Sequence, residues 1–143
     1  MSIQANEAVV RRIFDDIYNQ GNLAAVDEIF AADYVDHSAP PGFPSGLESF
    51  KQSFDMFRAA FPDIHVTVED VITEGDKVVV RLTFSGTHTG ALMGVPPSGK
   101  FVTITGIAID RIKGGKVVEH WVNRDDLGML QQLGVIPALG TIR

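Results

Sequence analysis

The sequence predicts a single small α+β domain over residues 1–143, with a strongly curved, mostly antiparallel sheet that wraps around an interior pocket. Apolar residues recur every three or four positions as far as residue 61, which is typical of helices. Alternating segments rich in Val, Ile and Thr follow from residue 64, which is typical of strands. Helices followed by strands indicate the α+β class rather than repeated βαβ units. Small residues along one long strand predict the pocket.

The N-terminal part is expected to form two helices packed on the sheet. The first covers residues 6–18, with Asn6 as its N-cap, and a shorter one covers residues 22–30. Both present one apolar side, as a helix does when it packs on a core. Asp36 and His37 fall in the loop that follows.

A third helix, over residues 45–61, has the clearest helical pattern in the chain. Ser45 and Glu48 fit a capping box at its start. Its apolar stripe consists of Leu47, Phe50, Phe54, Phe57 and Phe61. Phenylalanine is most often a core residue, so we interpret Phe54 and Phe57 as core side chains that can also cover the pocket.

Four strands and a closing helix are expected after Pro62. The strands cover residues 64–73, 77–87, 100–113 and 116–123. Gly114-Gly115 between the last two predicts a tight hairpin, which makes these strands antiparallel neighbours. A short helix is expected over residues 127–133.

The composition argues against several classes of partner. Acidic residues number 18 and basic ones 12, and the basic residues are scattered, so neither nucleic acid nor a membrane surface is an expected partner. The absence of cysteine excludes disulfides and thiolate chemistry. No signal-peptide pattern and no run of about 18 apolar residues occurs, which favours a cytoplasmic protein.

One glycine-rich segment matches the letters of a phosphate-binding loop. It begins at Gly94 and ends at Lys100, but Phe101 stands where a Ser or Thr should bind Mg²⁺. Pro96 and Pro97 carry no N–H group to bind phosphate, and a strand follows instead of a helix. The segment is therefore interpreted as a rigid loop between two strands.

The strand over residues 100–113 defines the predicted pocket. One face carries Val102, Ile104, Gly106, Ala108, Asp110 and Ile112. Gly106 and Ala108 are too small to fill the space beside them, so a gap is expected there. At its edge, Asp110 needs a partner or a raised pKa if little water reaches it. Alternatively, Asp110 is an exposed carboxylate at the strand end, near Arg111 or Lys113.

The next strand supplies a second wall. Its alternation places Val118, His120, Val122 and Arg124 on one face, with Trp121 and Asn123 on the other. If His120 and Val122 face the gap, the walls are apolar with few polar groups, as in most small-molecule sites. Arg124 and Trp121 complete the candidate binding residues, although the position of Trp121 favours the outer face or a subunit contact.

Histidines raise the alternative of a metal site. His37, His88 and His120 together with an aspartate have the side chains that a metal ion could use. They lie on separate elements without a short ligand pair, so no metal is expected. His65 alternates with polar residues in its strand and is expected to face solvent.

Five segments resemble the SnoaL-like polyketide cyclases, which are often called ester cyclases. The resemblance covers nearly the whole chain. Its segments are residues 33–37 (DYVDH), 86–90 (GTHTG), 93–97 (MGVPP), 115–121 (GKVVEHW) and 125–134 (DDLGMLQQLG).

The resemblance implies a cone-shaped α+β fold of the kind found in ketosteroid isomerase and scytalone dehydratase, usually assembled as a homodimer or higher homo-oligomer. It also implies intramolecular aldol cyclisation of a polyketide without metal or organic cofactor. In such a reaction a base removes a proton beside a carbonyl group, and the pocket stabilises the enolate. The expected partner is a small, apolar, carbonyl-containing molecule.

Two positions depart from the family pattern. The carboxylate that serves the studied cyclases as acid and base corresponds to Val122, and a neighbouring strand histidine is replaced by Ala108. We therefore expect Asp110 or His120 to transfer the proton, with Asp36, His37 and His88 orienting the substrate or donating to its oxygens. The remaining candidate substrate contacts are Gly106, Ala108, Val122, Phe54, Phe57, Trp121 and Arg124.

Two alternatives to a cyclase or isomerase remain open from the sequence. One is a ligand-binding or accessory protein without catalysis, which Val122 favours. The other is a dehydratase or hydrolase on the same fold, because the fold alone does not determine the chemistry.

Overall fold

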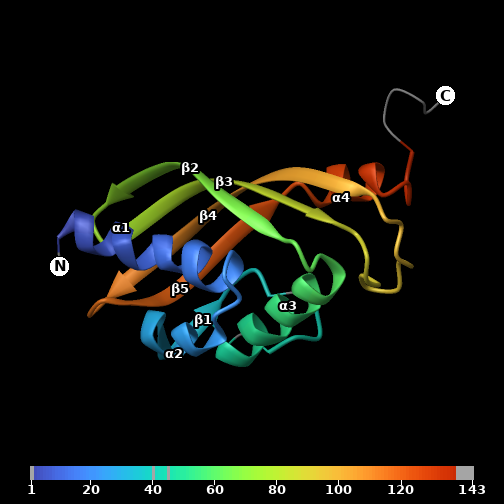
Figure 1. Ribbon diagram of the computed structural model, residues 1–143. Helices are drawn as coiled ribbons and strands as arrows, with labels where there is room; N and C mark the ends of the chain where they lie inside the picture. Colours follow the sequence, from blue (N-terminus) through green and yellow to red (C-terminus); the bar gives the residue numbers. More distant parts are fainter. Residues whose placement is uncertain (1, 40, 45, 138–143) are drawn as a thin grey trace.

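The computed structural model describes residues 2–39, 41–44 and 46–137 (Figure 1). The helical elements are α1 (Ile3–Arg12), a π-helical segment (Ile13–Tyr18), a 3-10 turn (Leu23–Ala25), α2 (Val26–Ile29), α3 (Leu47–Ala60) and α4 (Asp126–Gln132). The strands are β1 (Phe30–Asp36), β2 (His65–Glu74), β3 (Lys77–Thr87), β4 (Phe101–Lys113) and β5 (Lys116–Arg124).

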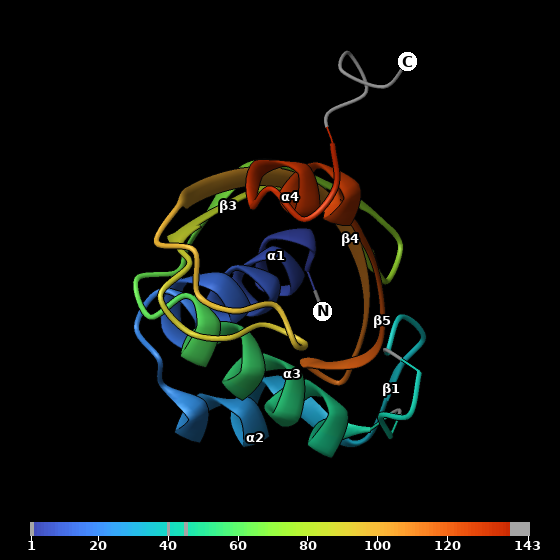
Figure 2. The same cartoon turned by 90° about the vertical axis from the view of Figure 1, so that its right-hand side faces the viewer.

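The five strands form one mixed sheet in the order β1-β5-β4-β3-β2. β1 runs parallel to β5, and the other neighbours are antiparallel. The sheet curls around α1 without closing, and α2 and α3 cover its open side (Figure 2). The predicted α+β class and the curved, mostly antiparallel sheet are confirmed.

β1 is the element that the sequence analysis missed. The chain from Phe30 to Asp36 is predicted as a helix end and a loop, but it pairs with β5, where Phe30 lies opposite Val117 and Asp36 opposite His120. Its register shifts between Phe30 and Val35, so no regular alternation marks the strand. Backbone hydrogen bonds to the edge of β5 stabilise an extended conformation that the local sequence does not favour.

The helix starts also differ from the prediction. α1 begins at Ile3, because the side chain of Ser2 accepts a hydrogen bond from the N–H of Ala5, and Asn6 lies inside the helix, where it is buried. Ser45 lies outside the described residues. α3 begins at Leu47 with Gly46 at the N-cap and no capping side chain.

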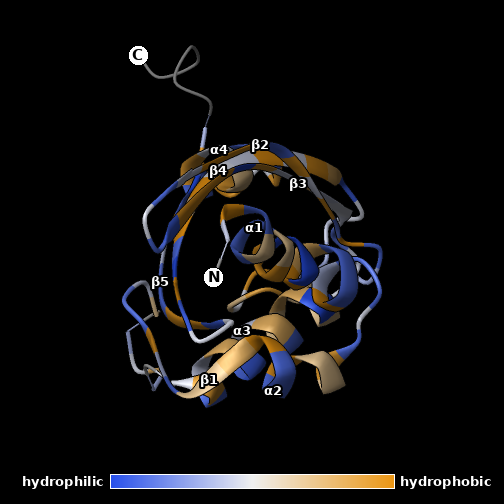
Figure 3. Ribbon diagram, turned by 90° about the vertical axis from the view of Figure 1, so that its left-hand side faces the viewer, coloured by the Kyte–Doolittle hydropathy of each residue, from blue (hydrophilic) through white to orange (hydrophobic). Residues whose placement is uncertain are grey.

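The core lies between α1, α3 and the concave face of the sheet, which encloses α1 in Figure 3 as well. On β4, each second residue from Val102 to Ile112 is buried, which confirms the predicted alternation. A smaller apolar cluster lies beneath α4. None of the described helices combines the length and the apolarity needed to cross a membrane.

Candidate active site

A cavity lies between the N-terminal helices and the concave face of the sheet. It encloses about 600 Å³ of empty space, part of it open to solvent. Its apolar walls are Ile13, Phe14, Phe30, Phe50, Leu82, Phe84, Ala108 and Val122. Its polar lining consists of Tyr18, Asp36, Ser38, Ser53, His120 and Arg124. Apolar walls with a few convergent polar groups are typical of small-molecule sites.

His120 and Asp110 form a buried ionisable pair at this cavity. The pairing of β4 with β5 places them opposite each other, and Nδ1 of His120 donates a 2.7 Å hydrogen bond to Oδ1 of Asp110. The Asp110 side chain is fully buried, so the exposed alternative for this residue is wrong. His120 lines the cavity. Within the described part of the chain, its ring bonds only through Nδ1, which leaves Nε2 available to a bound molecule.

The electrostatic surroundings raise the pKa of His120 above its usual value of 6.5. Burial is the largest influence and by itself lowers this pKa, because it disfavours the charged imidazolium. The charge and hydrogen bond of Asp110, together with the charge of Asp36, outweigh burial. The two carboxylates therefore make His120 a stronger base than a free imidazole.

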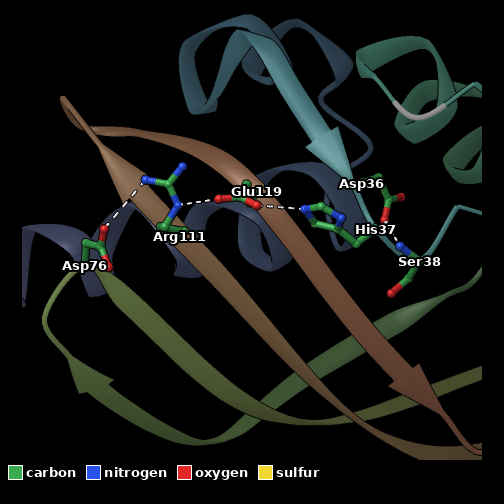
Figure 4. Close-up of polar contacts among 6 residues, drawn as sticks. All are labelled: Asp36, His37, Ser38, Asp76, Arg111 and Glu119. Carbon is green, nitrogen blue, oxygen red and sulfur yellow. Dashed lines mark hydrogen bonds and ion pairs between the residues drawn. The ribbon is translucent and has the colours of Figure 1, made fainter.

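Asp36 and Ser38 join the cavity from the end of β1. The carboxylate of Asp36 accepts a 2.9 Å hydrogen bond from the N–H of Ser38 (Figure 4). The Ser38 hydroxyl accepts a 2.8 Å hydrogen bond from the N–H of Val122 on β5. The structure thus brings Asp36 together with His120, and it adds Ser38, which the sequence analysis does not identify.

The small residues of β4 have different surroundings. Ala108 lines the cavity, as does Val122 opposite it on β5. Gly106 does not border a gap, because a Cβ atom there would come within 3.0 Å of the Phe84 ring and 3.3 Å of the Arg124 side chain. The expectation of empty space beside Gly106 is wrong, since two large side chains fill it.

A bulge changes the inner face of β5 near its start. Ile112 pairs with Val117, and Arg111 pairs with Glu119, so Val118 has no partner across the ladder. Val117 is fully buried in the core instead. Val117, rather than Val118, thus pairs with an inward residue of β4, as His120, Val122 and Arg124 do.

His37 points away from the cavity, although it follows Asp36 directly. Its Nε2 donates a 2.7 Å hydrogen bond to Glu119, which also accepts from Arg111 (Figure 4). These bonds lower the pKa of Glu119. The ring of His37 stacks on Trp121 at 4.7 Å between centroids. Neither His37 nor Trp121 lines the cavity, because this network lies on the opposite face of the sheet.

His88 also lies away from the cavity. Its side chain is fully buried, and its Nδ1 accepts a 3.2 Å hydrogen bond from the N–H of Ser98. The ring lies 5.5 Å from that of Phe61. His88 therefore holds the loop that precedes β4. In the described ranges, no three His, Asp or Glu side chains gather closely enough to hold a metal ion.

Phe54 and Phe57 occupy different environments. Phe54 belongs to the core and contacts the Tyr18 ring edge-on at 5.4 Å. Phe57 lines a second cavity of about 440 Å³, again including open space. The walls of this second cavity are Tyr18, Phe57, Phe61, Ile64, Phe84, Ser85, Gly86, Val102, Ile104, Arg124, Asp126 and Met129.

Tyr18 is a cavity residue that the sequence analysis passes over. It follows Phe14 by four positions, the spacing of one helix face, and this spacing is the signal that could have identified it. Burial raises its pKa, so the hydroxyl stays neutral. Ser38 offered no comparable signal, since its position depends on the pairing of β1 with β5.

Asp110→Asn is expected to lower the pKa of His120, because it removes the strongest influence that raises it. NMR titration of the histidine rings, with His120→Gln for assignment, measures this shift.

In the wild type the pKa of His120 is higher in the folded state than in the unfolded state. The pair therefore stabilises the fold fully below pH 6.5 and loses this effect as the pH rises through the folded pKa. Asp110→Asn should flatten that dependence. An unchanged midpoint for His120 contradicts the electrostatic account.

The fold and the cavity place this protein in the class of cone-shaped α+β proteins with an interior cavity. The model of the family "SnoaL-like polyketide cyclase" matches residues 8–133. This match covers most of the chain, and the chain belongs to the SnoaL-like polyketide cyclase family, as the sequence resemblance predicts.

Several named cyclases are similar to this chain along most of their length. Nogalonic acid methyl ester cyclase from Streptomyces nogalater is 32% identical over 120 residues, which cover 82% of this chain and 89% of the relative. Aklanonic acid methyl ester cyclase DnrD from Streptomyces peucetius is 30% identical, with 88% of each chain covered. Among solved structures, TsrD from Streptomyces laurentii has a TM-score of 0.87 at 28% identity, covering 95% of this chain and 99% of its own.

Proposed function

We propose that this protein is a cyclase that acts without a cofactor on a small apolar carbonyl compound and uses His120 as its base. The observation that supports this most strongly is the hydrogen bond between His120 and the buried Asp110 at the wall of an apolar cavity. A carboxylate on Nδ1 fixes the tautomer whose Nε2 can accept a proton, and it stabilises the imidazolium that forms.

The proposed reaction conserves atoms and charge. Nε2 of His120 takes a proton from carbon beside a carbonyl group, and the electron pair of that C–H bond leaves an enolate. The enolate carbon attacks a second carbonyl of the same molecule, and the new alkoxide receives the proton back from His120. Holding both ends of one molecule in a confined cavity favours the ring closure. Because Val122 replaces the family carboxylate, His120 with Asp110 takes over its role in this proposal.

Asp36 and Ser38 have supporting roles in the proposal. Asp36 lies opposite His120 on the neighbouring strand and raises its pKa. Ser38 fixes the backbone of Val122 and can donate its hydroxyl hydrogen into the cavity. His37 and His88, which lie elsewhere, are left with structural contacts.

Aklanonic acid methyl ester, the compound named for one relative, is a direct test substrate. Wild-type protein with a metal chelator and no added cofactor is expected to convert it to an isomer of unchanged mass, since an intramolecular aldol addition loses no atoms. Liquid chromatography with mass detection measures the rate against His120→Gln. No conversion above that of the variant, for this ester and for nogalonic acid methyl ester, overturns the proposal.

Val122 favours a second candidate function, a binding protein without catalysis. An aliphatic side chain occupies the cavity wall where the family carries its acid and base. This candidate predicts that the wild type and His120→Gln bind the ester equally well, while neither converts it. Calorimetric titration alongside the rate measurement separates the two functions.

A further inference from the structure

Arg124 lies at the junction of the two cavities. It ends β5 and lines both cavities together with Tyr18 and Phe84, so the two cavities meet at these three side chains. Its side chain is only 22% exposed. The guanidinium lies 4.6 Å from the centre of the Phe57 ring, which forms part of the second cavity.

The Arg124 guanidinium has no hydrogen-bond acceptor among the described residues. The nearest carboxylate is that of Asp126, whose Oδ1 lies 3.9 Å from Nε, beyond hydrogen-bond length. Asp126 is itself 61% exposed, and such loose surface pairs contribute little. A guanidinium carries five N–H donors, and those of Arg124 are accessible at the cavities rather than sealed in the core. An oxygen of a bound molecule would satisfy them.

The charge of Arg124 also acts on the groups around the first cavity. It opposes the increase in the pKa of His120 and of Tyr18. A cation at this position favours negative charge that develops beside it during a reaction. The second cavity offers apolar walls on the far side of Arg124, so a molecule that reaches His120 and Arg124 can extend an apolar portion into it.

We propose that Arg124 binds the carbonyl oxygen beside the carbon that His120 deprotonates, and that the substrate is an elongated molecule whose apolar tail lies in the second cavity. This inference rests on the proposed function. When the C–H bond breaks, its electron pair forms the C=C bond of the enolate, and the carbonyl π electrons move onto the oxygen held by Arg124. The proton stays on His120 until ring closure. Arg124 is thus a catalytic residue that touches the reacting group.

A pair of bicyclic ligands tests the oxygen-binding role without turnover. One probe is 2,4-dinitro-1-naphthol, an acidic naphthol that is ionised at neutral pH. The other is 1,3-dinitronaphthalene, which has the same rings and nitro groups but lacks the naphthol oxygen. Calorimetric or absorbance titration gives both affinities. The wild type is expected to bind the naphtholate about tenfold more tightly, or better, because hydrogen bonds to charged groups are strong.

Arg124→Gln should lower this preference about tenfold while leaving the affinity for 1,3-dinitronaphthalene within about twofold. Arg124→Lys should retain part of it, because the charge remains without the planar donor pair. Arg111→Gln is the matched control, since it removes the same charge from the outer network and should leave the preference unchanged. Circular dichroism and thermal unfolding establish that each variant folds.

The inference is overturned if the wild type shows no preference for the naphtholate, or if Arg124→Gln and Arg111→Gln have equal effects. Its failure differs from failure of the proposed function. If His120→Gln abolishes turnover and Arg124→Gln leaves the ligand preference unchanged, the cyclase proposal stands and the role of Arg124 falls. If His120→Gln turns over normally while Arg124→Gln loses the preference, the oxygen site stands without the proposed base.

Discussion

His120→Gln is expected to lower turnover of the test ester by about 100-fold to 10,000-fold, the usual contribution of a positioned acid or base. Glutamine can still donate to Asp110 but cannot accept a proton at neutral pH. The apolar walls remain, so KM should change by much less than kcat. Steady-state kinetics measure both constants, and the remaining activity should lose its dependence on pH between 6 and 9.

His65→Gln is the matched control, because His65 is exposed on β2 and lines neither cavity. It should leave kcat unchanged. In the wild type, activity should increase as the pH rises through the raised pKa of His120, since the neutral ring is the base. Equal kcat values for the two variants would remove His120 from the mechanism.

Gly90→Ala is expected to destabilise the fold by about 3 kcal/mol, a large share of a total stability of about 5–15 kcal/mol. The added Cβ would overlap with the carbonyl oxygen of Ala59 and approach its carbonyl carbon to 3.0 Å. These are backbone atoms at the end of α3, so they cannot move aside by rotating a side chain. The N–H groups of Thr89 and Gly90 both donate to Ala60 in the same place, and these bonds would lengthen.

Urea unfolding monitored by circular dichroism measures this loss. Gly46→Ala is the matched control, because a Cβ there would contact only the Tyr34 carbonyl oxygen at 3.7 Å. That variant should lower the free energy of unfolding by about 1 kcal/mol, because alanine is a poorer N-cap residue than glycine but meets no steric conflict there. Similar losses in both variants would contradict the steric account of Gly90.

The sequence predicted the strands well because their periodicity is local. Alternation along β4 assigns Ala108 and Asp110 to the inner face, and the structure buries both. Turn residues such as Gly114-Gly115 fix where the strands end, since their backbone angles suit tight turns. β1 escaped prediction because its stability comes from a partner that is distant in the chain.

Parts of the site were equally predictable, and others were not. Alternation assigns Asp110 to the inner face of β4, but counting outward from the two-residue turn would place Glu119 opposite it. The bulge at Val118 shifts the register by one residue, so His120 pairs with Asp110 instead. The expectation for Gly106 was wrong, because alternation gives the direction of a side chain and not what packs against it. Phe84 and Arg124 fill that space from elsewhere in the fold.

By itself, the sequence determined the α+β class, the inner face of β4 and the family to which the chain belongs. Only the tertiary structure decided that Asp36 lies beside His120, that His37 turns to the other face, and that Arg124 borders both cavities. The physical reason is the distance along the chain over which each kind of interaction acts. Turn chemistry and alternation act over a few residues, whereas the pairing of β1 with β5 and the packing of large side chains depend on the closure of the whole chain.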